Sequence, residues 1–384
     1  MEITLTIFDE TLRDGEQQVG IFFDAKIKHT LAQLIVKTGV HYMALMPAIH
    51  HSEAKLVSNL IDRGFKNTLV ASTMMGKRYI DESIECGVET IILFNAVSDR
   101  LLWLRHREFR DRLWDKNIEP EIINRIRYTA LDKILTHLKY AQSRGLKICF
   151  AAEDASRANF DFLVECINKF SPYIDRFLLC DTVGILTPEA TKIWVRNLID
   201  FTEDKTPLAV HFHNDRGLAV ENTIQAILAG ATGISGTFGG IGERSGNVAL
   251  EQVLNGLKLR YGWQVKGINY DAIAPVTKYL SSQGFIANPP YSPASLRYET
   301  GIHVETLLRD KGSYYLFDGG EPDIWFGKFS GASNFKYLFE KQLKQPLSIE
   351  QYREYRETIK SLSIQQKRSF SAEEVKEILG VASL

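Results

Sequence analysis

Two histidines one residue apart are the first sign of chemistry in this sequence. His211 and His213 stand at the end of an apolar run, and Asn214 and Asp215 follow them directly. Side chains at positions i and i+2 of a strand point to the same face, so both imidazoles would face a single cation. A structural pair, or a pair that only supports other ligands, explains the pattern equally well. Whether the pair binds a metal depends on whether other strand ends supply further ligands.

Asp14 is the expected third ligand, and Asn247 can add an amide oxygen. Asp14 lies in "DETLRDGEQ" (9–17), and Asn247 closes the glycine-rich stretch "GGIGERSGN" (239–247). Two imidazoles with carboxylate or amide oxygens suit Zn, Mn, Fe or Co, and suit Mg less well. The glycine-rich stretch lacks the G-K-[ST] ending of a P-loop, and a flexible turn is its alternative reading.

Arg13 and Thr182 are candidates for holding a substrate. Arg13 stands directly before Asp14, where it could stabilise negative charge developing on a metal-bound ketone oxygen. A salt-bridged turn explains the same pair, and the sequence leaves the two readings open. Thr182 in "CDTVG" (180–184) could hold a carboxylate through its hydroxyl, or could form a simple turn.

Eight short β-type runs must position these groups, and they alternate with helix-type segments over the first 240 residues. The runs cover residues 2–8, 41–46, 67–72, 89–94, 146–151, 175–180, 207–212 and 232–238. Eight strands with crossovers fit a (β/α)8 TIM barrel better than an open doubly wound sheet. The reactive residues follow the carboxyl ends of these runs, which meet at one mouth of a barrel. The sequence therefore predicts an α/β protein with its site at that mouth.

The alternation stops near residue 265, and this predicts three regions. We expect a catalytic barrel over residues 1–265, a linker and lid over 266–330, and a small C-terminal helical subdomain over 331–384. No strand is expected after residue 265. The tail contains "SAEE" (371–374), which matches a helix capping box.

The composition excludes several classes of protein. The chain has 384 residues, 45% of them hydrophobic, and a formal net charge of -1, so it can bury a large core. It has no overall charge to attract nucleic acid or a membrane surface, and no apolar stretch approaches the ~18 residues of a membrane span. The four cysteines form no C-x-x-C pair, and the N-terminus lacks a signal-peptide pattern. We therefore expect a cytoplasmic protein without nucleic-acid or membrane partners.

Six motifs together resemble a known superfamily. Their order and spacing are similar to those of the pyruvate carboxyltransferase-like (DRE-TIM) metal-dependent barrels, which include 2-isopropylmalate, citramalate and homocitrate synthases and hydroxymethylglutaryl-CoA lyases. Segments 96–100, 145–165 and 367–375 look most like the homocitrate synthases associated with nitrogenase. The motifs are "DETLRDGEQ" (9–17), "EDASR" (153–157), "DTVGILTP" (181–188), "HFHNDRGLA" (211–219), "GIGERSGN" (240–247) and "ETGIHV" (299–304).

The resemblance implies an acyltransferase whose acyl group becomes alkyl on transfer. It would condense acetyl-CoA, or another acyl-CoA, with a 2-oxo acid and then hydrolyse the thioester. By family likeness Asp14, His211 and His213 bind a divalent metal, with Asn247 close to it. A homodimer that exchanges its lids is also implied.

The remaining roles follow from the same resemblance. Arg13 would polarise the ketone, and Thr182 would hold the 1-carboxylate of the 2-oxo acid, with Gln17 beside them in the substrate site. Glu153 and the lid residue His303 are the acid/base candidates. His303 would come from the partner subunit, as in relatives, or would only pack within the lid.

The acceptor is where the sequence departs from its relatives. Ala44 stands where they commonly carry a glutamate in the second strand, and Cys149 stands where lysine-pathway homocitrate synthases place an arginine. 2-Oxoglutarate would then need another cation, for which Arg100 and the run "LRHREFRDR" (104–112) are candidates, although such a run is more often a solvated helix face. A synthase for a different 2-oxo acid and a catalytically silent metabolite-binding paralogue are the alternatives. A lyase is disfavoured because residues 239–247 contain no cysteine.

Overall fold

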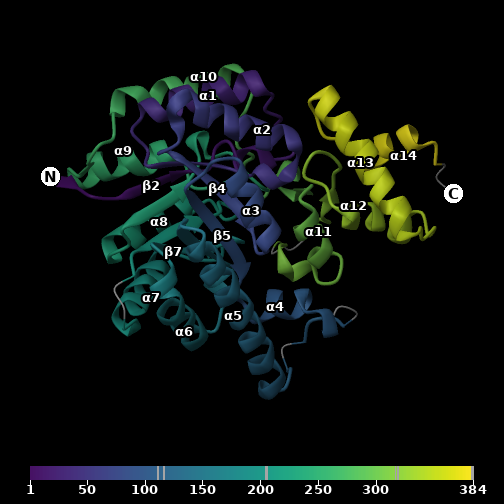
Figure 1. Ribbon diagram of the computed structural model, residues 1–384, viewed down its shortest axis with the longest axis horizontal. Coiled ribbons are helices and arrows are strands. Elements are labelled where there is room, and N and C mark those ends of the chain that lie inside the picture. Colours follow the sequence, from purple (N-terminus) through teal and green to yellow (C-terminus); the bar gives the residue numbers. More distant parts are fainter. Residues whose placement is uncertain (110–111, 116, 204–205, 316, 318–319, 382–384) are drawn as a thin grey trace.

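A closed ring of eight parallel strands forms the centre of the molecule (Figure 1). This computed structural model describes residues 1–109, 112–115, 117–203, 206–315, 317 and 320–381. Hydrogen bonds join β2 to both β3 and β9, which closes the ring. The strands are β2 (Thr6–Asp9), β3 (Tyr42–Leu45), β4 (Leu69–Met74), β5 (Thr90–Ala96), β6 (Lys147–Glu153), β7 (Arg176–Asp181), β8 (Leu208–Phe212) and β9 (Gly233–Gly236). The predicted (β/α)8 TIM barrel is confirmed.

Helices cover the outside of the ring, most of them in the crossovers between strands (Figure 1). Buried apolar faces pack them onto the strands, as with Leu31 and Ile35 of the first helix. The helix that ends at Ala229 is closed by a left-handed cap at Gly230, whose φ is 116°. The helices are α1 (Ala25–Lys37), α2 (His51–Leu60), α3 (Lys77–Glu85), α4 (Asp99–Arg105), α5 (Pro120–Ser143), α6 (Phe160–Phe170), α7 (Pro188–Phe201), α8 (Ala219–Ala229), α9 (Leu250–Tyr261) and α10 (Ile273–Ser282).

The predicted strands need two corrections. The run 2–8 is split, because β1 (Glu2–Ile3) leaves the ring and pairs with β10 (Gln264–Val265). The expectation of no strand after residue 265 is also wrong, since β11 (Arg297–Tyr298) pairs with β12 (Asp323–Ile324). Two-residue strands are too short to produce an alternating pattern in the sequence.

The inside of the barrel changes from apolar to polar along β8. Leu178 of β7 pairs with Ala209 of β8, and both belong to an apolar cluster inside the ring. One inward position further along, Cys180 lies opposite His211, and His213 follows two residues later. Inward side chains recur every second residue, so a strand such as β8 contributes first to an apolar floor and then to a polar rim.

The chain after the barrel forms a lid and a group of helices beside the barrel (Figure 1). The lid helix is α11 (Gly301–Leu307), and α12 (Ala332–Lys336), α13 (Ile349–Gln366) and α14 (Ala372–Leu379) follow it. The predicted capping box at residues 371–374 is confirmed at the start of α14. None of the helices in the described part of the chain has the length and apolar character needed to cross a bilayer.

Four buried charges tie the C-terminal region to the barrel. The ammonium of Lys28 lies 2.6 Å from Glu16 and 2.7 Å from Glu53. Lys328, which follows the lid, lies 3.0 Å from Glu16 and 2.5 Å from Glu53. All four residues are buried. Two cations and two carboxylates therefore neutralise one another out of contact with water.

We predict that Glu53→Ala lowers the free energy of unfolding by about 3–5 kcal/mol, because it leaves Lys28 and Lys328 buried with one carboxylate between them. Urea denaturation measures the change. Glu165→Ala, which removes the partly exposed partner of the more exposed Lys169, is the matched control and should change stability far less. Equal effects of the two substitutions would contradict this account of the cluster.

Candidate active site

A cavity of about 120 Å³ lies at the carboxyl ends of the strands, beneath the lid. Eight of the ten predicted site residues line it, whereas Asn247 and Arg100 do not. The carboxyl ends of the strands of a parallel barrel are where such enzymes carry their chemistry. The eight lining residues are Arg13, Asp14, Gln17, Glu153, Thr182, His211, His213 and His303.

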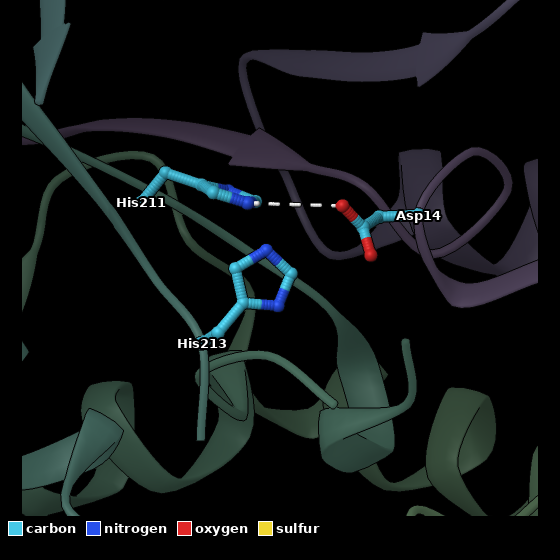
Figure 2. Close-up of side chains that lie close together, drawn as sticks. All are labelled: Asp14, His211 and His213. Atoms are coloured by element: carbon cyan, nitrogen blue, oxygen red, sulfur yellow. Dashed lines mark ion pairs between the residues drawn. The ribbon is translucent and has the colours of Figure 1, made fainter. Parts of the chain in front are cut away.

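Asp14, His211 and His213 converge in the rim of this cavity (Figure 2). One ligand atom from each lies within 4.8 Å of the others, and Nε2 of His211 is 3.7 Å from Oδ2 of Asp14. The two histidines lie at the end of β8, and Asp14 lies in the turn after β2. The expected facing of the two imidazoles is therefore seen in the structure.

The electrostatics of these three side chains suit a cation. Burial lowers the pKa of His211 and holds that of His213 well below its usual value, so both rings are neutral at neutral pH. Burial by itself raises the pKa of Asp14, but the neighbouring Arg13 guanidinium, together with a hydrogen bond from Asn247, outweighs it and holds this pKa well below its usual range. An ionised carboxylate beside neutral imidazoles is the protonation state that metal binding requires.

Asn247 lies beside this group and holds Asp14 in place. Its Nδ2 donates a hydrogen bond to Oδ1 of Asp14 at 2.8 Å. Oδ1 of Asn247 and Nδ1 of His213 are buried and have no hydrogen-bond partner among the described residues. An unsatisfied buried polar atom is costly, so the site is incomplete without a further group. The donor set and these two atoms fit a divalent metal ion.

Arg13 is held at the rim by three neighbours. Its Nε lies 2.8 Å from Glu10, and one terminal nitrogen lies 2.8 Å from Asp14 and 3.2 Å from Gln17. Nε2 of Gln17 in turn donates to the hydroxyl of Thr300 in the lid at 3.2 Å. The guanidinium is thus fixed next to the predicted metal ligands, facing the cavity.

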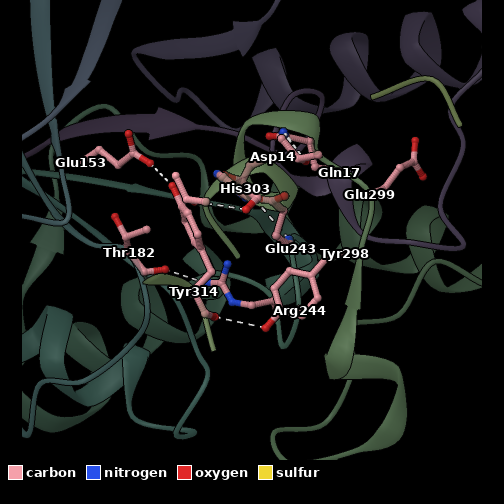
Figure 3. Close-up of polar contacts among 12 residues, drawn as sticks. Asp14, Gln17, Glu153, Thr182, Glu243, Arg244, Tyr298, Glu299, His303 and Tyr314 are labelled. Atoms are coloured by element: carbon pink, nitrogen blue, oxygen red, sulfur yellow. Dashed lines mark hydrogen bonds and ion pairs between the residues drawn. The ribbon is translucent and has the colours of Figure 1, made fainter. Parts of the chain in front are cut away.

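Glu153 is bound on both carboxylate oxygens. Arg105 donates to Oε2 at 2.5 Å and to Oε1 at 2.8 Å. The hydroxyl of Tyr314 also donates to Oε1 (Figure 3). Burial alone raises the pKa of Glu153, but Arg105 overcomes this effect and lowers it to about 2. Glu153 is therefore a stable anion with little capacity to accept a proton.

His303 reaches the cavity from the lid of the same chain. Its Nδ1 lies 2.9 Å from Oε2 of Glu243, and its ring stacks on Tyr314 with centroids 4.0 Å apart (Figure 3). Glu243 follows β9, so this contact joins the lid to the barrel rim. The second ring nitrogen of His303 is left for a ligand in the cavity.

Thr182 is fixed by a network below the rim. Its hydroxyl oxygen accepts a hydrogen bond from the backbone of Asp154 at 2.8 Å, so the hydroxyl hydrogen remains available to a ligand. Its carbonyl accepts from Arg244 at 2.6 Å, and Arg244 forms a buried ion pair with Asp215 at 2.7 Å. The buried pair keeps Thr182 in one position.

The structure does not bring Arg100 to the cavity. Arg100 pairs with Asp310 at 2.5 and 2.7 Å. In the run 104–112, Arg105 contacts Glu153, while residues 110 and 111 lie outside the described residues. The Glu243–His303 contact and the role of Tyr314 could not be predicted from the sequence, since their partners come from distant segments. Glu10, three residues before Arg13, was not singled out either.

Ala44 and Cys149 do not line the cavity either. Both are buried in the apolar cluster inside the barrel, with Ala44 in β3 and Cys149 in β6. Burial raises the pKa of the Cys149 thiol to about 12, which keeps the thiol neutral. Both positions are therefore uncharged and lie in the barrel interior, outside the cavity lining.

Comparison with known proteins agrees with this arrangement. The family described as HMGL-like matches residues 4–279. Homocitrate synthase AksA of Methanothermobacter thermautotrophicus is 32% identical over 347 residues, covering 88% of this chain and 84% of that protein. 2-Isopropylmalate synthase 2 of Caldanaerobacter subterraneus is 30% identical over 374 residues, covering 94% and 91%. The crystal structure of hydroxymethylglutaryl-CoA lyase from Pseudomonas aeruginosa superposes with a TM-score of 0.58 at 18% identity, covers 76% of this chain and 96% of that one, and shares the fold.

We predict that His213→Ala weakens binding of Co²⁺ or Zn²⁺ by more than the ~10–100-fold that loss of an outer partner costs, because it removes a direct ligand. The visible spectrum of bound Co²⁺ and calorimetric titration measure the loss. His137→Ala on the outer helix α5 is the control and should bind like the unaltered protein. Unchanged affinity in His213→Ala would place the metal elsewhere.

Proposed function

The chain belongs to the HMGL-like family, and on this premise we propose that it condenses an acyl-CoA with a 2-oxo acid and then hydrolyses the thioester. The acyl group becomes an alkyl group on transfer. The observation that carries the proposal is one cavity in which the Asp14, His211 and His213 group faces Arg13 and the lid residue His303. Similarity to proteins named homocitrate synthase and 2-isopropylmalate synthase supports this reaction class.

The rim residues are arranged to bind and polarise the 2-oxo acid. A divalent ion held by Asp14, His211 and His213 supplies Lewis acidity to the ketone when it is bound. The Arg13 guanidinium stabilises the negative charge that develops on the ketone oxygen. The hydroxyl of Thr182 donates to the carboxylate, because its oxygen already accepts from the backbone of Asp154.

His303 is the better placed of the two acid/base candidates. Both oxygens of Glu153 are occupied and its pKa is about 2, so it serves to hold Arg105 and Tyr314. One ring nitrogen of His303 faces Glu243, which would stabilise the positive charge gained when the other nitrogen takes a proton.

The bond changes follow from these roles. His303 removes a proton from the carbon next to the thioester carbonyl, and the resulting carbanion forms a C–C bond with the ketone carbon. The ketone π electrons move to oxygen beside Arg13, and that oxygen then takes up a proton. Water attacks the thioester, and the products are a carboxylate and the free thiol of CoA.

A cytoplasmic homodimer is part of the same proposal. Exchange of lids between subunits also stays a prediction, because a single chain already brings its own His303 beneath its own lid. A dimer would then serve to stabilise the lid over the site.

We predict that the metal-loaded protein releases free thiol from acetyl-CoA when it is given its 2-oxo acid. A panel of 2-oxo acids with Zn, Mn, Co, Fe or Mg, read with a chromogenic thiol reagent, tests this. His303→Gln should lower kcat by about 10²–10⁴-fold with little change in the KM of the 2-oxo acid, since it removes the base. His106→Gln is the control, since this side chain lies outside the cavity lining and contacts the backbone of Glu108 and the ring of Phe109 in its own loop. Absence of thiol release with every acceptor and metal would overturn the proposal.

A further inference from the structure

The floor of the cavity is made of uncharged, mostly apolar side chains. Ile92, Phe94, Ala151 and Leu178 project from β5, β6 and β7 into the barrel and line the cavity below the rim. Ser72 adds one hydroxyl, which has no hydrogen-bond partner among the described residues. An acceptor bound by its 2-oxo acid group at the rim would direct its side chain onto this floor.

The charges needed to bind a second carboxylate are missing from this floor. Among the described residues lining the cavity, Arg13 is the only lysine or arginine, and Glu10 and Asp14 already neutralise it. Arg105 lies behind Glu153, which it pairs with, and Arg100 is paired with Asp310 away from the cavity.

We propose that the acceptor is a 2-oxo acid with an uncharged, apolar side chain. An acceptor with a distal carboxylate would bury that charge against Ile92 and Leu178 without a cation, which is strongly unfavourable. An alkyl or aromatic side chain would gain from leaving water at the same place. This inference rests on the proposed function, and it limits the likeness to homocitrate synthases to a shared reaction with a different acceptor.

A pair of acids of matched shape tests the inference. 5-Methyl-2-oxohexanoate carries an isopropyl group where 2-oxoglutarate carries its distal carboxylate. In calorimetric titration of the metal-loaded protein, without acyl-CoA, the apolar acid should bind about 100-fold more tightly. Equal or tighter binding of 2-oxoglutarate would overturn the inference. Because this readout needs no turnover, it stays distinct from a failure of the condensation itself.

Leu178→Ala provides a second test, since it deepens the floor and should shift the preference toward bulkier apolar acids such as phenylpyruvate. Leu198→Ala in α7 removes an equally buried leucine that does not line the cavity. This variant controls for a loss of stability, and the variant protein should keep the acceptor preference of the unaltered protein. The same shift in both variants would contradict the assignment of the floor.

A second cavity lies next to the first and supports a separate inference. It has a volume of about 420 Å³ and lies on the other side of the lid, next to α12 and α13. Gln17, Met46, Thr300 and Ile302 line both cavities, so the two spaces are adjacent at these side chains. A long, narrow ligand could thus extend from one cavity to the other.

The far side of this second cavity is cationic. Lys336 of α12 and Lys360 of α13 line it, and no carboxylate of the described residues lies within ion-pair distance of either. Arg356 lines it as well and is paired with Glu357. Glu305 is the one carboxylate in the described lining.

We infer that this cavity binds the phosphate-bearing nucleotide end of the acyl-CoA, an inference that also rests on the proposed function. The two lysines provide charge for phosphate groups. Met74 and Ile49 give an apolar path for the pantetheine chain toward the shared residues, and the half-buried ring of Phe329 offers a face for the adenine. The thioester would then lie beneath His303.

Calorimetric titration with CoA and with pantetheine tests this second inference. The double variant K336M/K360M should bind CoA about tenfold more weakly and bind pantetheine unchanged, because only CoA carries the phosphates. Lys192→Met, on the opposite side of the barrel in α7, is the control. Equal losses for CoA and pantetheine would overturn the assignment, as would inorganic phosphate binding as tightly as CoA.

Discussion

Closure of the strand ring is the constraint on which the rest of the structure depends. Once β2 pairs with both β3 and β9, the carboxyl ends of all eight strands meet, and inward side chains fall into levels. The level of Leu178 and Ala209 is apolar, and the residues that follow it carry His211 and His213. One geometric condition thereby produces both an apolar floor and a polar rim, so the ends of a bound 2-oxo acid meet different surroundings.

Charge compensation at the rim is the second condition. Arg13 has two carboxylate partners, Arg105 has Glu153, and Arg244 has Asp215, and each of these pairs is largely removed from water. A buried charge without a partner would destabilise the fold, so each buried charged residue at the rim requires a neighbour of opposite charge. The pKa of Glu153 shows the consequence, because the pairing that makes its burial possible also removes its basicity.

The parts of the structure that could be predicted are those that follow from local patterns in the sequence. Short β-type runs separated by helix-type segments predicted the eight strands, and the period of two within a strand predicted the shared face of His211 and His213, because both follow from local geometry. Arg100 and Arg105 could not be told apart, since both lie on α4 and only the folded lid decides that one meets Asp310 and the other Glu153. Tyr314 left no signal for the same reason. Contacts made across more than a hundred residues depend on tertiary packing, which a single sequence does not display.

The lid turn joins binding of both substrates to the chemistry. Thr300 and Ile302 lie between the two cavities, and His303 follows them in the same turn of α11. Gly301 packs so closely that a Cβ there would lie 2.4 Å from the backbone nitrogen of Gly331, which fixes this turn on the segment leading from Lys328. A ligand that spans both cavities would therefore contact the turn that carries His303, the proposed base. That turn packs on Gly331, and Lys328, three residues earlier, is paired with the buried Glu16 and Glu53. The fold therefore positions His303 independently of any substrate.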